Sequence, residues 1–129
     1  MTATAVSSRE AMIRELCAAA DAGDGERFAS FFSADATFRF ANFDELAGRA
    51  AIAASTEATV HAIWPTRHRV DQVAEVGDQL FCRFSILVQP PDVAELSLPC
   101  VTVVEVGEDG LITDYRVHMD ITPALRPEG

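Results

Sequence analysis

Four segments that alternate apolar and polar residues fill the second half of the chain. They span residues 67–76, 79–89, 95–106 and 111–121. Between them stand three turn-forming sequences: Gly77-Asp78, Pro90-Pro91-Asp92 and Gly107-Glu108-Asp109-Gly110. Neighbouring strands joined by turns this short pair antiparallel. The pattern therefore predicts an antiparallel meander of four strands.

Helical spacing dominates the first half of the chain. Ser7-x-x-Glu10 has the form of a capping box, in which Glu10 bonds back to the Ser7 amide. The apolar residues that follow recur at helical intervals, namely Ile13, Leu16, Cys17 and Ala20. We interpret the acidic break at 21–25 as a helix–helix turn, because a calcium loop needs later ligands and a closing Glu that this segment lacks.

Two more helices and one strand are expected before the meander. A short helix over 26–32 offers phenylalanine side chains to the core, and residues 36–41 alternate as a strand. A third helix begins at Gly48 and runs to about Ile63, where Trp64-Pro65 ends it. Helices first and strands afterwards predict an α+β domain, in which a curved sheet wraps around the helices.

Composition narrows the function classes. A chain of 129 residues with 49% hydrophobic residues forms one globular domain over residues 1–129. The net charge of −10 argues against binding to nucleic acid or to an anionic membrane surface. All ten basic residues are arginines, so Schiff-base chemistry and a P-loop are excluded because each needs a lysine amine.

Cysteine and histidine usage favours an intracellular protein without a metal. We expect Cys17, Cys82 and Cys100 to pack in the interior, and an odd cysteine count without a signal-peptide pattern predicts a cytoplasmic location. No apolar run approaches the roughly 20 residues that span a bilayer. The three histidines lack metal-ligand spacing, so neither a metal nor a cofactor is expected.

The last strand carries the most informative pattern of titratable groups. Successive side chains of a strand point to opposite faces. One face of residues 114–121 therefore holds Asp114, Arg116, His118 and Asp120, and the other holds Tyr115, Val117, Met119 and Ile121. If the ionisable face lines a cavity, Asp120 and His118 form a titratable pair at a pocket.

Three motifs accompany this order of helices and strands: Phe31-Phe32-Ser33-Ala34-Asp35-Ala36-Thr37-Phe38, Ala47-Gly48-Arg49-Ala50-Ala51-Ile52 and Gly110-Leu111-Ile112…Tyr115…Asp120. Together they resemble the nuclear transport factor 2-like superfamily. Over about residues 8–123 the chain is most similar to SnoaL-like polyketide cyclases and other ketosteroid isomerase-like small bacterial proteins. The resemblance implies a cone-shaped α+β barrel, with three N-terminal helices packed in a curved, mostly antiparallel sheet. Isomerases, cyclases, dehydratases, epoxide hydrolases and non-catalytic proteins share this fold, so the fold does not decide the reaction.

The catalytic patterns of these relatives match the chain unequally. The two carboxyl positions of ketosteroid isomerases hold Phe40 and Thr102, so their mechanism is not expected here. Of the set used by limonene epoxide hydrolases, Asn42, Arg83 and Asp120 are present. Phe40 and Ser85 replace its Tyr and its second Asp. SnoaL-like cyclases use one pocket Asp as acid and base, and this resemblance favours Asp120.

Physical chemistry gives three residues catalytic roles in this hypothesis. An aldol closure or an enolisation takes a proton from carbon and returns one to oxygen, and Asp120 performs both steps if its pKa is raised by an apolar pocket. His118 polarises a carbonyl or relays the proton, and Arg83 stabilises an enolate oxygen. The alternative is a structural Arg83–Asp120 ion pair that keeps Asp120 charged and inert.

The expected pocket is largely apolar and takes a hydrophobic, oxygen-bearing small molecule such as a polyketide. Its predicted substrate-binding residues are Asn42, Phe40, Trp64, Phe81, Ser85 and His68. His68 is expected to face inward because its neighbours Arg67 and Arg69 point the other way. The alternative is that the aromatic residues only fill the core.

The side chains on the opposite face of the sheet predict that the protein pairs with a second copy of itself. An apolar strip on this face favours a C2 homodimer. It consists of outward-facing Tyr115, Val117, Met119 and Ile121, extended by Leu80, Cys82, Phe84 and Ile86.

Three functions remain open. They are a cofactor-independent acid/base enzyme of the cyclase, isomerase or epoxide hydrolase type, a non-catalytic protein that binds a hydrophobic metabolite, and an assembly module that pairs through its sheet.

Overall fold

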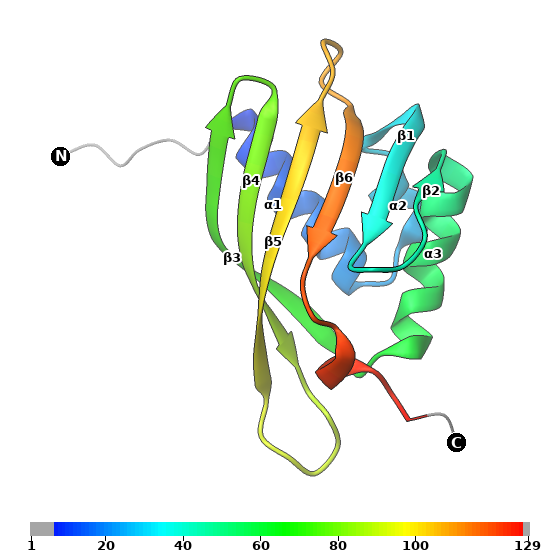
Figure 1. Ribbon diagram of the computed structural model, residues 1–129, viewed down its shortest axis with the longest axis vertical. Coiled ribbons are helices and arrows are strands. Elements are labelled where there is room, and N and C mark those ends of the chain that lie inside the picture. The colour runs from blue at the N-terminus through cyan, green and yellow to red at the C-terminus, as the bar shows by residue number, and fades with distance from the viewer. Residues whose placement is uncertain (1–6, 128–129) are drawn as a thin grey trace, which may run out of the picture.

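The computed structural model describes residues 7–127. The described chain contains three α-helices, six strands and a short C-terminal 3-10 helix (Figure 1). In chain order they are α1 (Ser8–Asp21), α2 (Gly25–Ala29), β1 (Phe32–Phe40), β2 (Leu46–Ala47), α3 (Arg49–Ala62), β3 (Thr66–Val76), β4 (Gln79–Val88), β5 (Leu96–Val106), β6 (Ile112–His118) and η1 (Thr122–Ala124). No helix among these residues is long and apolar enough to cross a membrane. The predicted α+β class is confirmed.

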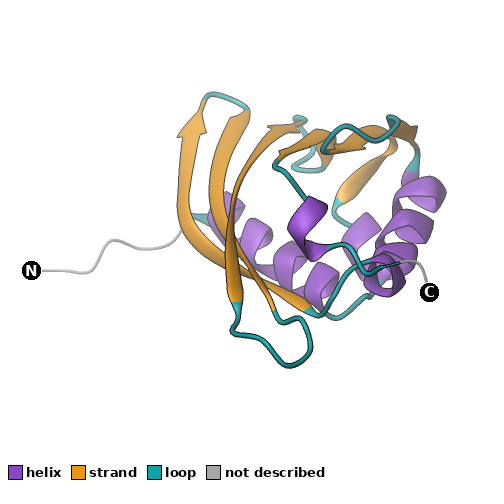
Figure 2. Cartoon of the chain, turned by 60° about the horizontal axis from the view of Figure 1, so that its bottom comes forward, coloured by secondary structure: helices purple, strands orange, loops and turns teal. Residues whose placement is uncertain are grey.

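The strands form one curved sheet in the order β2-β1-β6-β5-β4-β3 (Figure 1). β3 to β6 are the predicted antiparallel meander, and β1 lies parallel to β6 at the end of it. The helices lie together on one side of the curved sheet (Figure 2). α1 contacts β3, whereas α3 contacts β1 and β2. The sheet therefore has an inner face toward the helices and an outer face.

The main differences from the sequence prediction are two shifted element boundaries and one additional strand. β1 already begins at Phe32, so the second helix is shorter than expected and ends at Ala29. β2 is a two-residue strand, too short to show a period of two in the sequence. β6 ends at His118, so Asp120 lies beyond the strand, just before η1.

Side chains cap the first two helices. The Ser7 hydroxyl accepts a hydrogen bond from the Glu10 amide at 3.0 Å, which confirms the predicted N-cap of α1. The Glu10 carboxylate bonds to Arg14, at 3.2 Å from its Nη2, and the reciprocal half of the capping box is absent among the described contacts. Asp24 accepts from the Arg27 amide at 3.0 Å and caps α2, so the acidic break is the predicted helix–helix turn.

Aromatic rings fill the space between α2 and the sheet. Phe28 of α2 contacts Phe32 and Phe38 of β1 and Tyr115 of β6, with ring centroids 5.2, 6.1 and 5.8 Å away. All four side chains are buried. Burying a side chain of this size stabilises a fold by about 1.5–3 kcal/mol. This cluster fixes α2 and β1 against the centre of the sheet.

The predicted inner and outer faces of the sheet are reversed. Tyr115 and Val117 of β6 and Leu80, Cys82 and Phe84 of β4 are buried on the inner face. The prediction that these residues form an exposed apolar strip and a dimer interface is therefore wrong, because the helices of the same chain cover them. The homodimer itself stays a prediction, and the outer face offers it different side chains, Phe81 and Val101, which are 38% and 43% exposed.

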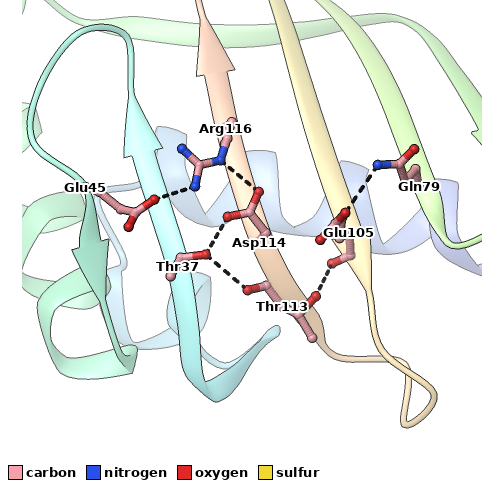
Figure 3. Close-up of polar contacts among 7 residues, drawn as sticks. All are labelled: Thr37, Glu45, Gln79, Glu105, Thr113, Asp114 and Arg116. Carbon is pink, nitrogen blue, oxygen red and sulfur yellow. Dashed lines mark hydrogen bonds and ion pairs between the residues drawn. The ribbon is translucent and has the colours of Figure 1, made fainter.

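A polar network crosses the outer face near β1 and β6 (Figure 3). Arg116 bonds through Nε to Asp114 at 3.0 Å and through Nη2 to Glu45, while Asp114 also accepts from the Thr37 hydroxyl. Glu45 belongs to the segment between β1 and β2. The network therefore ties that segment to the outside of the sheet.

A second outer-face network is built on a bulge in β3. The register between β3 and β4 shifts between Val70 and Gln72, so Asp71 is the extra residue. Its carboxylate accepts from the Ser85 hydroxyl at 2.6 Å and from Arg69 Nε at 2.8 Å. The Ser85 hydrogen bond, followed by the Arg69 hydrogen bond, lowers the pKa of Asp71 below its ordinary value.

This lowered pKa predicts a loss of stability in acid. Below the ordinary carboxyl pKa the unfolded chain binds a proton at Asp71 while the folded chain does not, so this contribution is present at neutral pH and is lost as the pH falls through the folded-state pKa. Urea titrations between pH 7 and pH 3 are expected to show a smaller decline of the unfolding midpoint for Asp71→Asn than for wild type. Equal declines would contradict the network's contribution.

Candidate functional site

A cavity of about 760 Å³ lies between the inner face of the sheet and the helices. Its wall is drawn from the C-terminal end of α1, from α2 and α3, from all six strands, and from residues 119–126, which follow β6 and form the C-terminal segment. The apolar wall includes Phe28, Phe38, Phe40, Trp64, Ile86, Val117, Met119, Ile121 and Leu125. This volume is within the range of small-molecule sites, roughly 300–1,000 Å³.

A histidine–carboxylate pair stands in this apolar wall. His68 Nδ1 lies 2.6 Å from Asp21 Oδ1, and the His68 amide donates to Asp21 Oδ2 at 2.9 Å. Both side chains are partly buried and both line the cavity. The His68 ring meets Phe84 edge to face, with centroids 5.4 Å apart. The Nδ1 hydrogen bond and the aromatic contact thus fix the orientation of the imidazole, and the amide hydrogen bond fixes that of the Asp21 carboxylate.

The contact with Asp21 determines which ring nitrogen of His68 carries the proton. A carboxylate only accepts hydrogen bonds, so Nδ1 of His68 carries the proton that is shared with Asp21. In the neutral imidazole this leaves Nε2 with a free lone pair. Asp21 stabilises the imidazolium that forms when Nε2 takes up a proton. The arrangement is therefore suited to general-base chemistry.

The position of Asp21 is unfavourable for a helix residue. It is the last residue of α1, and the last turn of α1 contains no basic residue. A carboxylate at a helix C-terminus is repelled by the partial negative charge of the exposed carbonyl groups. Its hydrogen bonds to His68 compensate for this placement.

Tyr115 and Cys100 supply neutral hydrogen-bonding groups to the cavity wall. Burial raises the pKa of Tyr115 well above its ordinary value, and a hydrogen bond with Thr102 opposes this effect. Burial likewise raises the pKa of the Cys100 thiol, and raises that of Cys82 to about 12. Tyr115 is therefore a neutral phenol, and these cysteines are protonated thiols that pack in the interior as predicted.

The C-terminal segment closes one side of the cavity. After η1, Leu125 pairs with Ile63, and the Trp64 amide donates to the Ala124 carbonyl at 2.9 Å. Arg126 then lies with its guanidinium carbon 5.1 Å from the centroid of the Trp64 ring. Trp64, Leu125 and Arg126 all line the cavity, and Arg126 remains exposed to solvent. This segment therefore forms part of the rim.

Three of the nine predicted site residues line the cavity. Phe40, Trp64 and His68 do so, and His68 faces inward as expected. The others lie outside its wall, namely Asp120, His118, Arg83, Phe81, Ser85 and Asn42. His118, Arg83, Phe81 and Ser85 belong to the outer face, and Asn42 is exposed between β1 and β2. The prediction that these side chains converge on one pocket is wrong, because the residues of β4 and β6 that we expected to face inward lie on the outer face.

Asp120 has a local structural role. Its carboxylate accepts from the Thr122 amide at 3.0 Å at the start of η1. Hydrogen bonds from the Thr122 side chain and amide lower the pKa of Asp120, whereas the acid/base hypothesis needed a raised one. No ion pair joins it to Arg83 among the described residues, which also contradicts the structural alternative.

The sequence interpretation missed Asp21, Tyr115 and Arg126. One signal was available for Asp21, because an acidic residue that ends a helix without a neighbouring basic side chain needs another reason to be there. Tyr115 was placed on the wrong face. Within residues 7–127 no three side chains of the metal-ligating types are grouped closely enough to hold an ion.

Comparison with known proteins identifies the family of this chain. The family model of the SnoaL-like domain matches residues 13–115. The chain belongs to the SnoaL-like family. The resemblance to SnoaL-like and ketosteroid isomerase-like proteins of the nuclear transport factor 2-like superfamily is thereby confirmed. No curated protein matches the chain in sequence.

Solved structures share the fold at low sequence identity. A protein of ketosteroid isomerase-like fold from Catenulispora acidiphila DSM 44928, in complex with trimethylamine, is 16% identical with a TM-score of 0.74 and covers 83% of each chain. SalBIII, an epoxide hydrolase/cyclase-like enzyme in pyran ring formation in the polyether salinomycin, is 18% identical with a TM-score of 0.72 over 92% of this chain and 95% of its own. An NTF2-like protein from Cytophaga hutchinsonii ATCC 33406 is 15% identical with a TM-score of 0.68 over 95% and 97%. At these identities the likeness concerns the fold alone.

Proposed function

We propose that this SnoaL-like protein is a cofactor-independent acid/base enzyme of the cyclase or isomerase type, acting on a small, hydrophobic, oxygen-bearing metabolite such as a polyketide. The His68–Asp21 pair in the wall of an apolar cavity carries this proposal. His68 replaces Asp120 as the proposed base.

The proposed reaction begins with proton removal from carbon. Nε2 of His68 takes a proton from a carbon next to a carbonyl group, and the C–H bonding electrons form the enolate. The neutral Tyr115 hydroxyl is a suitable donor to the developing oxyanion. Asp21 stabilises the imidazolium in the same step.

Ring closure or isomerisation completes the reaction. The enolate carbon attacks a second carbonyl of the same substrate, and the imidazolium proton passes to the alkoxide that forms. If the imidazolium instead protonates a different carbon, the product is an isomer. The apolar wall favours either outcome because it keeps water from the enolate. A cyclase/isomerase activity of this kind is consistent with the family and with the cyclase-like description of SalBIII.

Deuterium exchange into a simple hydrophobic ketone tests the proposal without its natural substrate. The wild-type protein is expected to accelerate exchange of the α-protons of 2-tetralone in D₂O above the buffer rate, followed by NMR. N-phenyl-1-naphthylamine, a neutral probe that fills apolar cavities, is expected to inhibit the exchange competitively. If the protein binds the probe but does not accelerate the exchange, the proposed enzymatic activity is contradicted and a non-catalytic binding protein is favoured.

A further inference from the structure

Arg126 is the one arginine in the described wall of the cavity. Its amide donates to the Ala62 carbonyl at 3.0 Å, and its Nε donates to the Ile63 carbonyl at 2.7 Å. Its guanidinium also lies over the Trp64 ring, with the guanidinium carbon 5.1 Å from the ring centroid. Two hydrogen bonds and a cation–π contact therefore hold this cation in place at the rim.

Within residues 7–127, no carboxylate lies within ion-pair distance of the Arg126 guanidinium. Two acidic side chains line the same cavity. Asp21 is bonded to His68, and Asp44 forms no ion pair with Arg126. The cation–π contact with Trp64 uses the face of the guanidinium and the Ile63 carbonyl uses Nε, so the two Nη groups at the opposite edge can donate to two oxygens of one anion.

We propose that Arg126 recognises an anionic group of the ligand, so that the cavity takes an organic acid with an apolar body and a carboxylate or similar oxyanion at the rim. This inference deepens the proposed function and rests on the same cavity. The net charge of −10 repels anions from the protein as a whole. An acidic ligand therefore needs a local cation, and planar guanidinium groups bind such oxyanions through two parallel hydrogen bonds.

Two fluorescent probes with one carbon skeleton test the inference. 8-Anilino-1-naphthalenesulfonate carries a sulfonate that N-phenyl-1-naphthylamine lacks. Trp64, the only tryptophan of the chain, lines the cavity beneath Arg126, so energy transfer from its indole reports binding at this site. Wild type is expected to bind the sulfonate more tightly than the neutral probe, and Arg126→Gln to weaken sulfonate binding about tenfold, as for one charge-assisted contact.

The neutral probe is the internal control for an intact cavity, and its affinity is expected to change less than about twofold in Arg126→Gln. Arg49→Gln is the matched variant, because Arg49 Nε also donates to a backbone carbonyl, that of Phe32, at 2.7 Å but lies outside this cavity. It is expected to change neither affinity.

The outcomes separate this inference from the proposed function. Equal binding of both probes by wild type, or an equal loss of both in Arg126→Gln, would overturn anion recognition while leaving ketone exchange untouched. A sulfonate preference without ketone exchange would retain anion recognition in a binding protein. If neither probe binds, the accessible cavity is refuted, and both proposals fail with it.

Discussion

Replacing His68 with glutamine is expected to abolish the proposed α-proton exchange, lowering its rate at least about 100-fold toward the buffer rate. The glutamine amide can still donate a hydrogen bond toward Asp21, but it has no basic nitrogen to receive a proton. Because the amide is close in size to the imidazole, binding of N-phenyl-1-naphthylamine is expected to stay within about twofold of wild type. NMR exchange rates and probe titrations on the same samples measure both effects.

His118→Gln is the matched control for this result. His118 is exposed on the outer face, opposite Val101, and lies outside the cavity wall. Its replacement removes one imidazole from the same protein and is expected to leave the exchange rate unchanged. The reverse pattern, with exchange lost in His118→Gln and kept in His68→Gln, would refute the His68 assignment and move the chemistry to the other side of the sheet.

The sequence predicted the strand pairing well because turn residues and alternation are local signals. Gly77 and Gly110 lie at the tips of two turns, with φ of 58° and 84°, where a side chain is disfavoured. The turns fix which strands are neighbours, and the meander follows. The parallel pairing of β1 with β6 joins segments about 80 residues apart in the chain and has no local signal.

Alternation divides a strand into two faces, but it does not say which face is buried. In β6 the titratable set was expected to line a pocket, whereas the structure buries Tyr115 and Val117 and leaves His118 exposed. Burying apolar area is favourable, and charged groups lose solvation when they are buried, so the ordinary amphipathic arrangement holds here. This inversion moved Arg83 and His118 away from the expected site, whereas Asp120 lies beyond the end of β6 and bonds to the Thr122 amide.

The site itself joins residues that only the tertiary structure brings together. Asp21 and His68 are 47 positions apart, and their contact depends on the packing of α1 against β3. His68 could be assigned to the inner face because Arg67 and Arg69 flank it in the sequence. The sequence gives no corresponding signal for Arg126, whose place in the wall depends on the pairing of the C-terminal segment with Ile63.

Replacing Gly25 with alanine is expected to destabilise the fold by about 2–3 kcal/mol, because it inserts a methyl group into closely packed structure. A Cβ at position 25 would lie 2.2 Å from the Ala53 carbonyl oxygen and 2.9 Å from Glu57 Cγ. The first contact is with the backbone of α3, so no rotamer change relieves it and α2 and α3 must move apart. Urea unfolding of the variant and of wild type measures the loss.

Gly107→Ala is the matched control, because the closest atoms to a Cβ there would be the side chains of Asp109 and Thr113 at 3.2 Å, and the nearest backbone atom, the Leu111 carbonyl oxygen, lies at an ordinary contact distance of 3.6 Å. Its cost is expected to stay below about 1 kcal/mol, since side chains adjust more easily than backbone. Separation of the two helices would also shift the residues of α3 that line the cavity, namely Ser55, Thr56, Ala58, Thr59, Val60 and Ala62. Gly25→Ala is therefore expected to weaken binding of N-phenyl-1-naphthylamine even below its unfolding transition, while Gly107→Ala keeps it. Equal stability of the two variants would contradict the close approach of α2 and α3 that sets the width of the site.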